Sequence, residues 1–169
     1  MSDTLQRDQV AALAKLQPAQ ALSKARGIQD PWFRSQAFAW LARFSPKDAA
    51  KFAREASRAA HECGDAYQRV AVRAWQVAAL AEIGHGTEAK KALATAVQES
   101  VDIIPVSSKA EALFLLLQAA ARIGTKEREF VHDALQNTCA ADGHWRSKRA
   151  LRNAELIREG KLEPRQFFW

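Results

Sequence analysis

Few residues of this sequence stand at spacings that support metal or acid–base chemistry. The soft metal-ligand candidates are His61, Cys63, His85, His132, Cys139 and His144. Only one residue separates His61 from Cys63, which is not the spacing of two ligands on one helix face, and no C-x2-C or H-E-x-x-H motif is present. A phosphate loop, a nucleophile elbow and a catalytic dyad are also missing from the sequence. We therefore predict no metal, no cofactor and no catalytic residue, although a catalytic site assembled from distant residues would leave no motif.

A polar stripe is the first pattern that indicates binding. Arg69, Arg73 and Gln76 stand at positions i, i+4 and i+7 of an otherwise apolar segment, so they share one helix face. The basic residues of comparable segments that would extend this stripe are Arg34, Arg43 and Arg122. We predict that the stripe binds a partner, while a solvated helix surface would give the same pattern.

Positive charge is concentrated toward the end of the sequence. The net charge is +6, and the part from Gly143 onward carries seven basic and three acidic residues, a net of +4. This asymmetry indicates an acidic partner for Arg146, Arg149 and Arg152. The alternative is a helix surface whose charges only keep the protein in solution.

Three large hydrophobic residues end the sequence: Phe167, Phe168 and Trp169. Solvated terminal segments rarely keep such side chains. The triplet can fold back and cover the open face of the last helix, as the terminal unit of a repeat array requires. Alternatively it docks into a partner or another copy, which makes Trp169 a partner-binding candidate and the triplet a candidate contact in a homo-oligomer.

The elements that must position these residues are helices. In Asp30-Pro31 and Ser45-Pro46, a residue that can cap a helix precedes a proline suited to the first helical position. Further boundary signals are Gly64, Asp65, Gly84, the capping box from Ser108 to Glu111, Gly124 and Gly160. No segment alternates with the period of a strand, so the sequence predicts an all-α fold.

The helix ends form an internal repeat. The units are LAKLQPAQAL from Leu13, LARFSPKDAA from Leu41, LAEIGHGTEA from Leu80 and AARIGTKERE from Ala120. Each unit contains the end of one helix, a tight turn and the start of the next. The distances from Leu41 to Leu80 and from Gly84 to Gly124 are 39 and 40 residues. A period near 40 residues indicates an α-solenoid.

We predict a right-handed α-solenoid of about four antiparallel helix pairs in one domain over residues 1–169. The expected segments are helix pairs at about 3–27, 30–64, 65–104 and 107–142, and a capping helix with a tail at 145–169. Trp40 and Trp75, which have apolar neighbours, are expected in the core, whereas Trp32 is expected to be partly exposed.

The segment DPWFRSQAFAWLA, from Asp30 to Ala42, resembles the D-P-x-x-R-x-x-A-x-x-x-L-A units of bacterial tetratricopeptide-like and HEAT-like helical repeat proteins. Degenerate copies extend from Ala11 to Gly124. The period exceeds the 34 residues of a tetratricopeptide repeat, and the W-x2-L-G-x2-Y pattern is not in register. The resemblance implies a superhelical scaffold that binds other macromolecules, and it transfers no catalytic residues.

Three functions are compatible with these patterns. The first is a non-enzymatic scaffold that binds a protein or peptide on its concave face. The second is a nucleic-acid-binding protein of the HEAT-like kind, a class that includes DNA glycosylases. The observation that favours this function is the sequence pI of about 9.6. The third is a structural unit that assembles through its tail.

Location is predicted from the same composition. The first residues include Asp3, Arg7 and Asp8, which a signal peptide would not have, and the longest apolar run, 112–121, is too short to cross a membrane. With two cysteines and no C-x-x-C motif, the sequence predicts a cytoplasmic protein without a membrane partner.

Overall fold

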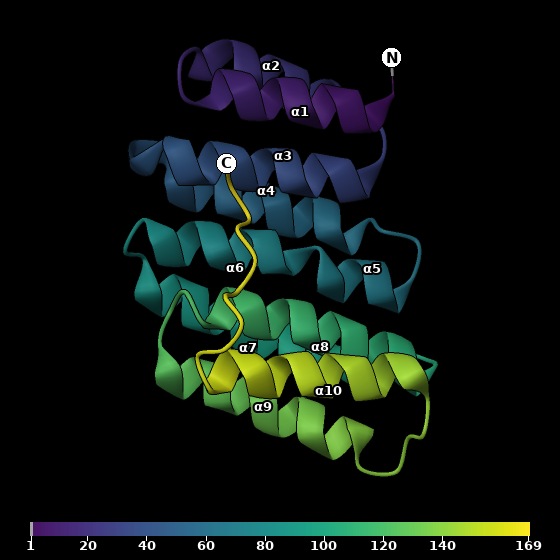
Figure 1. The fold of residues 1–169 in the computed structure, drawn as a ribbon. Coiled ribbons are helices and arrows are strands. Elements are labelled where there is room, and N and C mark those ends of the chain that lie inside the picture. The colour runs from purple at the N-terminus through teal and green to yellow at the C-terminus, as the bar shows by residue number, and fades with distance from the viewer. Residues whose placement is uncertain (1) are drawn as a thin grey trace.

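The computed structural model describes residues 2–169, and this part of the chain contains helices and no strand (Figure 1). The prediction of an all-α fold is therefore confirmed. The helices of the first half are α1 (Asp3–Ala14), α2 (Pro18–Gly27), α3 (Pro31–Phe44), the 3₁₀ helix η1 (Pro46–Asp48) and α4 (Ala49–His61). Those of the second half are α5 (Ala66–Ala71), α6 (Arg73–Glu82), α7 (Gly86–Glu99), the 3₁₀ helix η2 (Ser100–Asp102), α8 (Val106–Ala120), α9 (Thr125–Cys139) and α10 (Trp145–Arg158).

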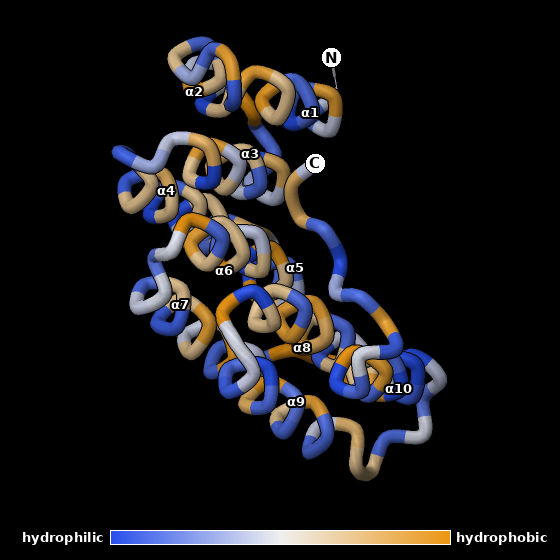
Figure 2. Tube along the Cα trace, turned by 60° about the vertical axis from the view of Figure 1, so that its left-hand side comes forward, coloured by the Kyte–Doolittle hydropathy of each residue, from blue (hydrophilic) through white to orange (hydrophobic). Residues whose placement is uncertain are grey.

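Consecutive helices pack against each other in pairs: α1 with α2, α3 with α4, α6 with α7, and α8 with α9. The pairs follow one another in chain order down the molecule (Figure 1). Each first helix also contacts the first helix of the next pair, so α1, α3, α6 and α8 form one layer, which we call the front row. The second helices α2, α4, α7 and α9 form the back row on the other side (Figure 2).

Two of the predicted helix starts are confirmed by their capping bonds. The Asp30 carboxylate accepts a hydrogen bond from the backbone N–H of Trp32 at 2.8 Å, and the Asp65 carboxylate accepts one from Gln68 at 2.7 Å. These bonds satisfy N–H groups that have no partner within their own helix. The capping residues in the sequence therefore predict the starts of α3 and α5 correctly.

At two other predicted starts the expected capping bond is not formed, although the helical segments begin at Pro46 and within one residue of position 107. The Ser45 hydroxyl is buried without a hydrogen-bond partner, and the backbone carbonyl of Ser45 closes the turn by accepting from the N–H of Asp48 at 2.9 Å. A 3₁₀ turn, η1, therefore precedes α4. The capping box at Ser108 fails because α8 starts earlier, at Val106, directly after Pro105 in extended conformation.

The helix expected from Asp65 to Gly84 is divided at Val72 into α5 and α6. At this point the N–H of Trp75 donates to the carbonyl of Val72 at 3.2 Å, three residues back rather than four. The end of α6 is as predicted, since Gly84 has a φ of 82° and adopts the left-handed conformation that favours glycine.

Small residues and large aromatic residues share the core. Ala37, Ala39 and Ala42 of α3 are completely buried, and they allow neighbouring helices to lie close together. The core positions of Trp40 and Trp75 are confirmed, with exposed fractions of 0% and 6%.

The last helix, α10, packs on α8 and, less extensively, on α9 (Figures 1 and 2). Its buried residues Ser147, Ala150, Ala154 and Ile157 are spaced three or four apart, and three of them are small, so this face fits closely against α8. After Gly160 the chain turns back, and residues 161–169, which we call the tail, cross the front row toward α1 (Figure 1).

Candidate peptide-binding face

The tail places two aromatic side chains into the front row. Phe167 is fully buried and meets the edge of Trp75 on α6, with ring centroids 5.4 Å apart. Phe168 is 5% exposed and meets Trp40 on α3 at 5.1 Å. Both pairs have edge-to-face geometry, which adds to the stabilisation from burial. The triplet therefore folds back within its own chain, but onto the front row and not onto the last helix.

The residues that flank these two phenylalanines remain nearer to solvent. Trp169 is 60% exposed, although its ring meets Trp40 at a centroid distance of 4.7 Å. The guanidinium of Arg165 lies over the ring of Trp75 at 5.0 Å. Partial burial, and then the positive charge of Arg7, lower the pKa of Arg165 from its usual range. The tail therefore has buried anchors between more exposed neighbours.

Side chains of the front row and of the turns that follow its helices also bind the main chain of the tail. The Gln118 side-chain oxygen accepts from the N–H of Arg165 at 3.0 Å, and the Arg122 guanidinium donates to the carbonyl of Arg165 at 2.9 Å. Near the other end, the Lys15 ammonium donates to the carbonyl oxygen of Trp169 at 2.9 Å. Such hydrogen bonds hold an extended chain whatever its side chains are.

Four of the residues beside the tail occupy one repeat position. Lys15, Arg43, Glu82 and Arg122 are each the third residue of a repeat unit. Glu82 pairs with the Arg43 guanidinium at 2.6 Å and lies 4.0 Å from that of Arg122. Together with Phe168 and Trp169, the four line a cavity of about 600 Å³. The sequence pattern predicted Arg122 and Arg43 as members of the binding stripe but not Lys15 and Glu82, although all four share one position of the repeat.

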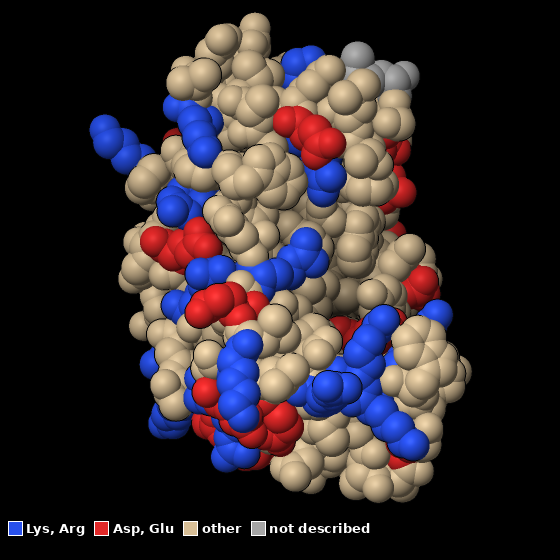
Figure 3. All heavy atoms as spheres, viewed as in Figure 1, with Lys and Arg blue, Asp and Glu red and all other residues tan. Residues whose placement is uncertain are grey.

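The basic residues of α10 form a separate group. Lys and Arg side chains gather over the α10 side of the face that carries the tail, with Asp and Glu among them (Figure 3). Arg149 pairs with Glu111 of α8 at 3.0 Å, and Arg146 approaches the same carboxylate at 4.0 Å. Both guanidinium groups also lie over the ring of Trp145, whereas Arg152 is simply exposed. Part of the predicted positive charge is therefore neutralised within the protein.

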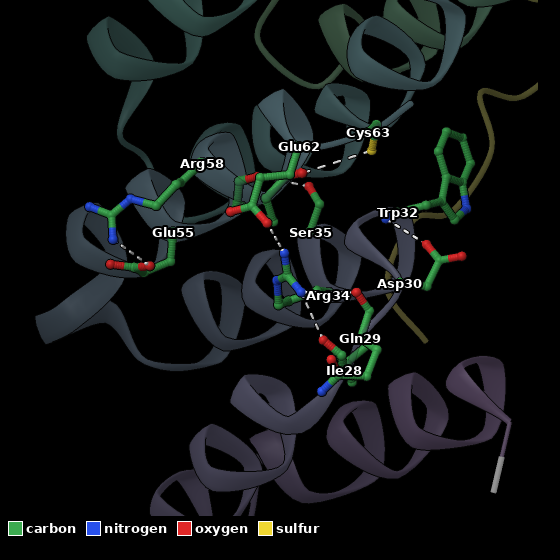
Figure 4. A network of polar contacts seen from close by, with 12 residues as sticks. Ile28, Gln29, Asp30, Trp32, Arg34, Ser35, Glu55, Arg58, Glu62 and Cys63 are labelled. Carbon is green, nitrogen blue, oxygen red and sulfur yellow. Dashed lines mark hydrogen bonds and ion pairs between the residues drawn. The ribbon is translucent and has the colours of Figure 1, made fainter. Parts of the chain in front are cut away.

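Arg34 and Arg69 hold connections between helices. The Arg34 guanidinium donates to the carbonyls of Ile28 and Gln29 at 2.9 and 3.0 Å and pairs with Glu62 (Figure 4). It thereby joins the connection before α3 to the end of α4. The Arg69 guanidinium donates to the carbonyl of Cys63 at 3.1 Å and joins the connection before α5 in the same way. These bonds give both residues a structural role.

The remaining members of the predicted stripe lie inside the molecule. Arg73 is 2% exposed, and its guanidinium pairs with Glu99 of the back row at 3.2 Å. Burial lowers the pKa of Arg73, and the charge of Glu99 opposes this shift. Gln76 is buried as well. The structure therefore does not bring Arg69, Arg73 and Gln76 together on one open surface, because α6 is covered on both sides.

Residues 2–169 contain no group of three or more His, Cys, Asp or Glu side chains arranged to hold a metal ion. Cys63 and Cys139 are buried and unpaired. In the same residues, none of the helices combines the length and apolar character required to cross a membrane. No protein-family model matches the sequence, and neither do any curated proteins or solved structures.

Proposed function

We propose that the protein is a non-enzymatic helical repeat scaffold that binds an extended segment of a protein partner on its front row. In this proposal the four helix pairs form a right-handed α-solenoid whose concave face is the front row. The pairwise packing in chain order supports this arrangement, because solenoid units contact mainly their neighbours along the chain.

The observation that carries the proposal is the position of the tail. It is an extended segment, and it meets the front row through buried aromatic side chains and through hydrogen bonds to its main chain. Peptide-binding surfaces combine these two kinds of contact, the first for specificity and the second for affinity. The fitting partner is therefore a segment with two adjacent aromatic residues, like Phe167 and Phe168.

A partner must compete with the tail. Because the tail belongs to the same chain, its effective concentration at the front row is on the order of millimolar. A partner segment with the same intrinsic affinity would therefore bind the unmodified protein weakly. Release of the tail would uncover the full surface.

The test uses the full chain with Phe167→Ala and Phe168→Ala, which weaken the tail without shortening it. A fluorescently labelled peptide with the sequence KLEPRQFFW is titrated into this variant and into the unmodified protein. We expect saturable binding that is about tenfold or more tighter to the variant, because the competing tail is released. The matched control peptide has alanine at both phenylalanine positions and should not bind.

An additional Arg122→Gln substitution in the variant should weaken binding of the peptide, since it removes a hydrogen bond to the peptide main chain. Circular dichroism establishes that each variant keeps its helices. A folded variant that binds neither peptide would contradict the proposal and would leave the tail with a purely structural role.

A further inference from the structure

A second cavity lies on the side of the molecule away from the tail, between the back-row helices α4 and α7. Its volume is about 350 Å³, which is within the range of small-ligand sites. One face of α4 supplies Ala53 and Ser57, and one face of α7 supplies Ala92 and Thr95. These side chains are small, so the space between the two helices is not filled, and α6 forms the floor.

Two buried polar residues of α6 lie on this floor. Arg73 and Gln76 are 2% and 8% exposed and stand one helical turn apart. Nη2 of Arg73 is engaged, since it lies 3.2 Å from the Glu99 carboxylate and 2.9 Å from Nε2 of His61. Nε of Arg73 and Oε1 of Gln76, however, are buried without any hydrogen-bond partner.

Unpartnered atoms of this kind are rare in folded proteins, and each one needs an explanation. Here a side chain with a charged donor and a side chain with an uncharged acceptor line the same cavity. The pair is complementary to a ligand that offers an anionic oxygen and, beside it, a hydroxyl or amine hydrogen.

The rim of the cavity has the same electrostatic preference. Arg54 on α4 and Lys91 on α7 are exposed and line the opening, as does His61. The acidic residue of the lining is Glu88, and Glu99 is already paired with Arg73. Apart from His61, the cations Arg54, Lys91 and Arg73 exceed these two carboxylates by one charge. Ala53, Leu80 and Ala92 give the interior an apolar wall for the body of a ligand.

We propose that this cavity binds a small organic anion, with its phosphate or carboxylate group on Nε–H of Arg73 and a hydroxyl or amine on Oε1 of Gln76. The site shares α6 with the contacts of the tail, but its lining includes none of the residues that the tail contacts. It therefore stands independently of the proposed peptide binding.

The test is a nuclear magnetic resonance titration of the full chain labelled with ¹⁵N. The probes are inorganic phosphate and acetate, and sodium chloride at equal ionic strength is the reference. We expect a saturable shift of the Arg73 Nε–Hε signal, together with shifts of backbone amides in α4 and α7. The comparison of the two probes identifies which oxyanion the site prefers, and saturation by either one supports the proposal.

Paired surface variants provide the control. The first pair, Arg54→Gln with Lys91→Gln, removes two positive charges from exposed positions at the rim. It should lower the affinity for the probe anion at least about fivefold. Lys51→Gln with Lys90→Gln makes the same change of net charge on the same helices, outside the lining, and should leave the affinity unchanged. Shifts that do not saturate, or equal weakening by both pairs, would overturn the proposal.

Discussion

At the scale of single residues, Trp40 connects the core with the tail. Its side chain is completely buried in the middle of α3, and the rings of Phe168 and Trp169 both meet it edge to face. The same indole therefore contributes to the packing of the helix pairs and to the surface on which the tail packs. A substitution here acts on both.

Trp40→Ala should lower the free energy of unfolding by about 3–5 kcal/mol, through lost burial and the cavity that remains. The measurement is a denaturant melt of the variant and the unmodified protein. Trp145→Ala is the control, since Trp145 is 59% exposed and its loss should change stability by only about 0.5 kcal/mol. A change below about 1 kcal/mol at Trp40 would contradict the buried position.

The thiol of Cys63 should make stability depend on alkaline pH. Burial, and then the charges of Asp30 and Asp65, raise its pKa to about 11, above the value of about 8.5 in unfolded chains. The folded state therefore keeps a proton that the unfolded state has lost, so stability present below about pH 8.5 should decline as the pH approaches 11. Denaturant melts at pH 8 and pH 10 measure this decline in stability.

Cys63→Ala provides the comparison for this experiment, because the pKa values of Tyr67 and Cys139 are raised as well. The variant should lose less stability between the two pH values than the unmodified protein. Equal losses in both proteins would show that Cys63 titrates normally in the folded state.

Burial of Trp40 and Trp75 could be predicted from the sequence, because their neighbours are apolar. The position of Arg73 could not. Its spacing from Arg69 and Gln76 indicates a shared face, but every residue from 70 to 80 is buried, so this segment has no face on the outer surface. A polar side chain in a helix covered on both sides points into the protein, and a local pattern does not show which helices provide the cover.

At the scale of elements, Gly84 and Gly86 give a matched test of the turn between α6 and α7. Gly84 has a φ of 82°, so Gly84→Ala should cost about 1–2 kcal/mol through backbone strain. Gly86 is the first residue of α7 and has no positive φ, so Gly86→Ala should be neutral or stabilise by up to about 1 kcal/mol. Thermal melts compare the two. Equal effects would contradict the described turn.

The sequence predicts where a helix begins along the chain better than it predicts where that helix packs in the fold. Asp30 and Asp65 cap helices where expected, because their bonds are formed within three residues. The positions of α10 and the tail depend instead on contacts between distant parts of the chain. The bond from Lys15 to Trp169 spans 154 positions, and no local pattern encodes it.

At the scale of the whole molecule, the excess of positive charge should give only weak binding to duplex DNA. Two to four phosphate contacts from α10 would give a slope of roughly −2 to −4 in a plot of log affinity against log salt concentration. Arg146 and Arg149 already share Glu111, which reduces the charge available. We expect sequence-independent binding that is largely lost at physiological salt.

Fluorescence anisotropy with a labelled duplex at several salt concentrations measures this slope. Glu111→Gln is an informative variant, because it frees both arginines and should increase the affinity at low salt. Tight binding that persists at high salt, or that prefers one sequence, would favour the nucleic-acid function over the proposed scaffold.

The path of the tail has a consequence for how the molecule unfolds. In a simple repeat array each unit contacts only its neighbours, so the two ends can fray independently of each other. Here the tail contacts Gln118 of α8, Trp75 of α6, Trp40 of α3 and Lys15 beside α1. Opening of the first pair therefore also releases contacts far along the chain. The tail thus couples the first helix pair to the last, so that amide exchange in α1 and α8 should follow a common cooperative opening.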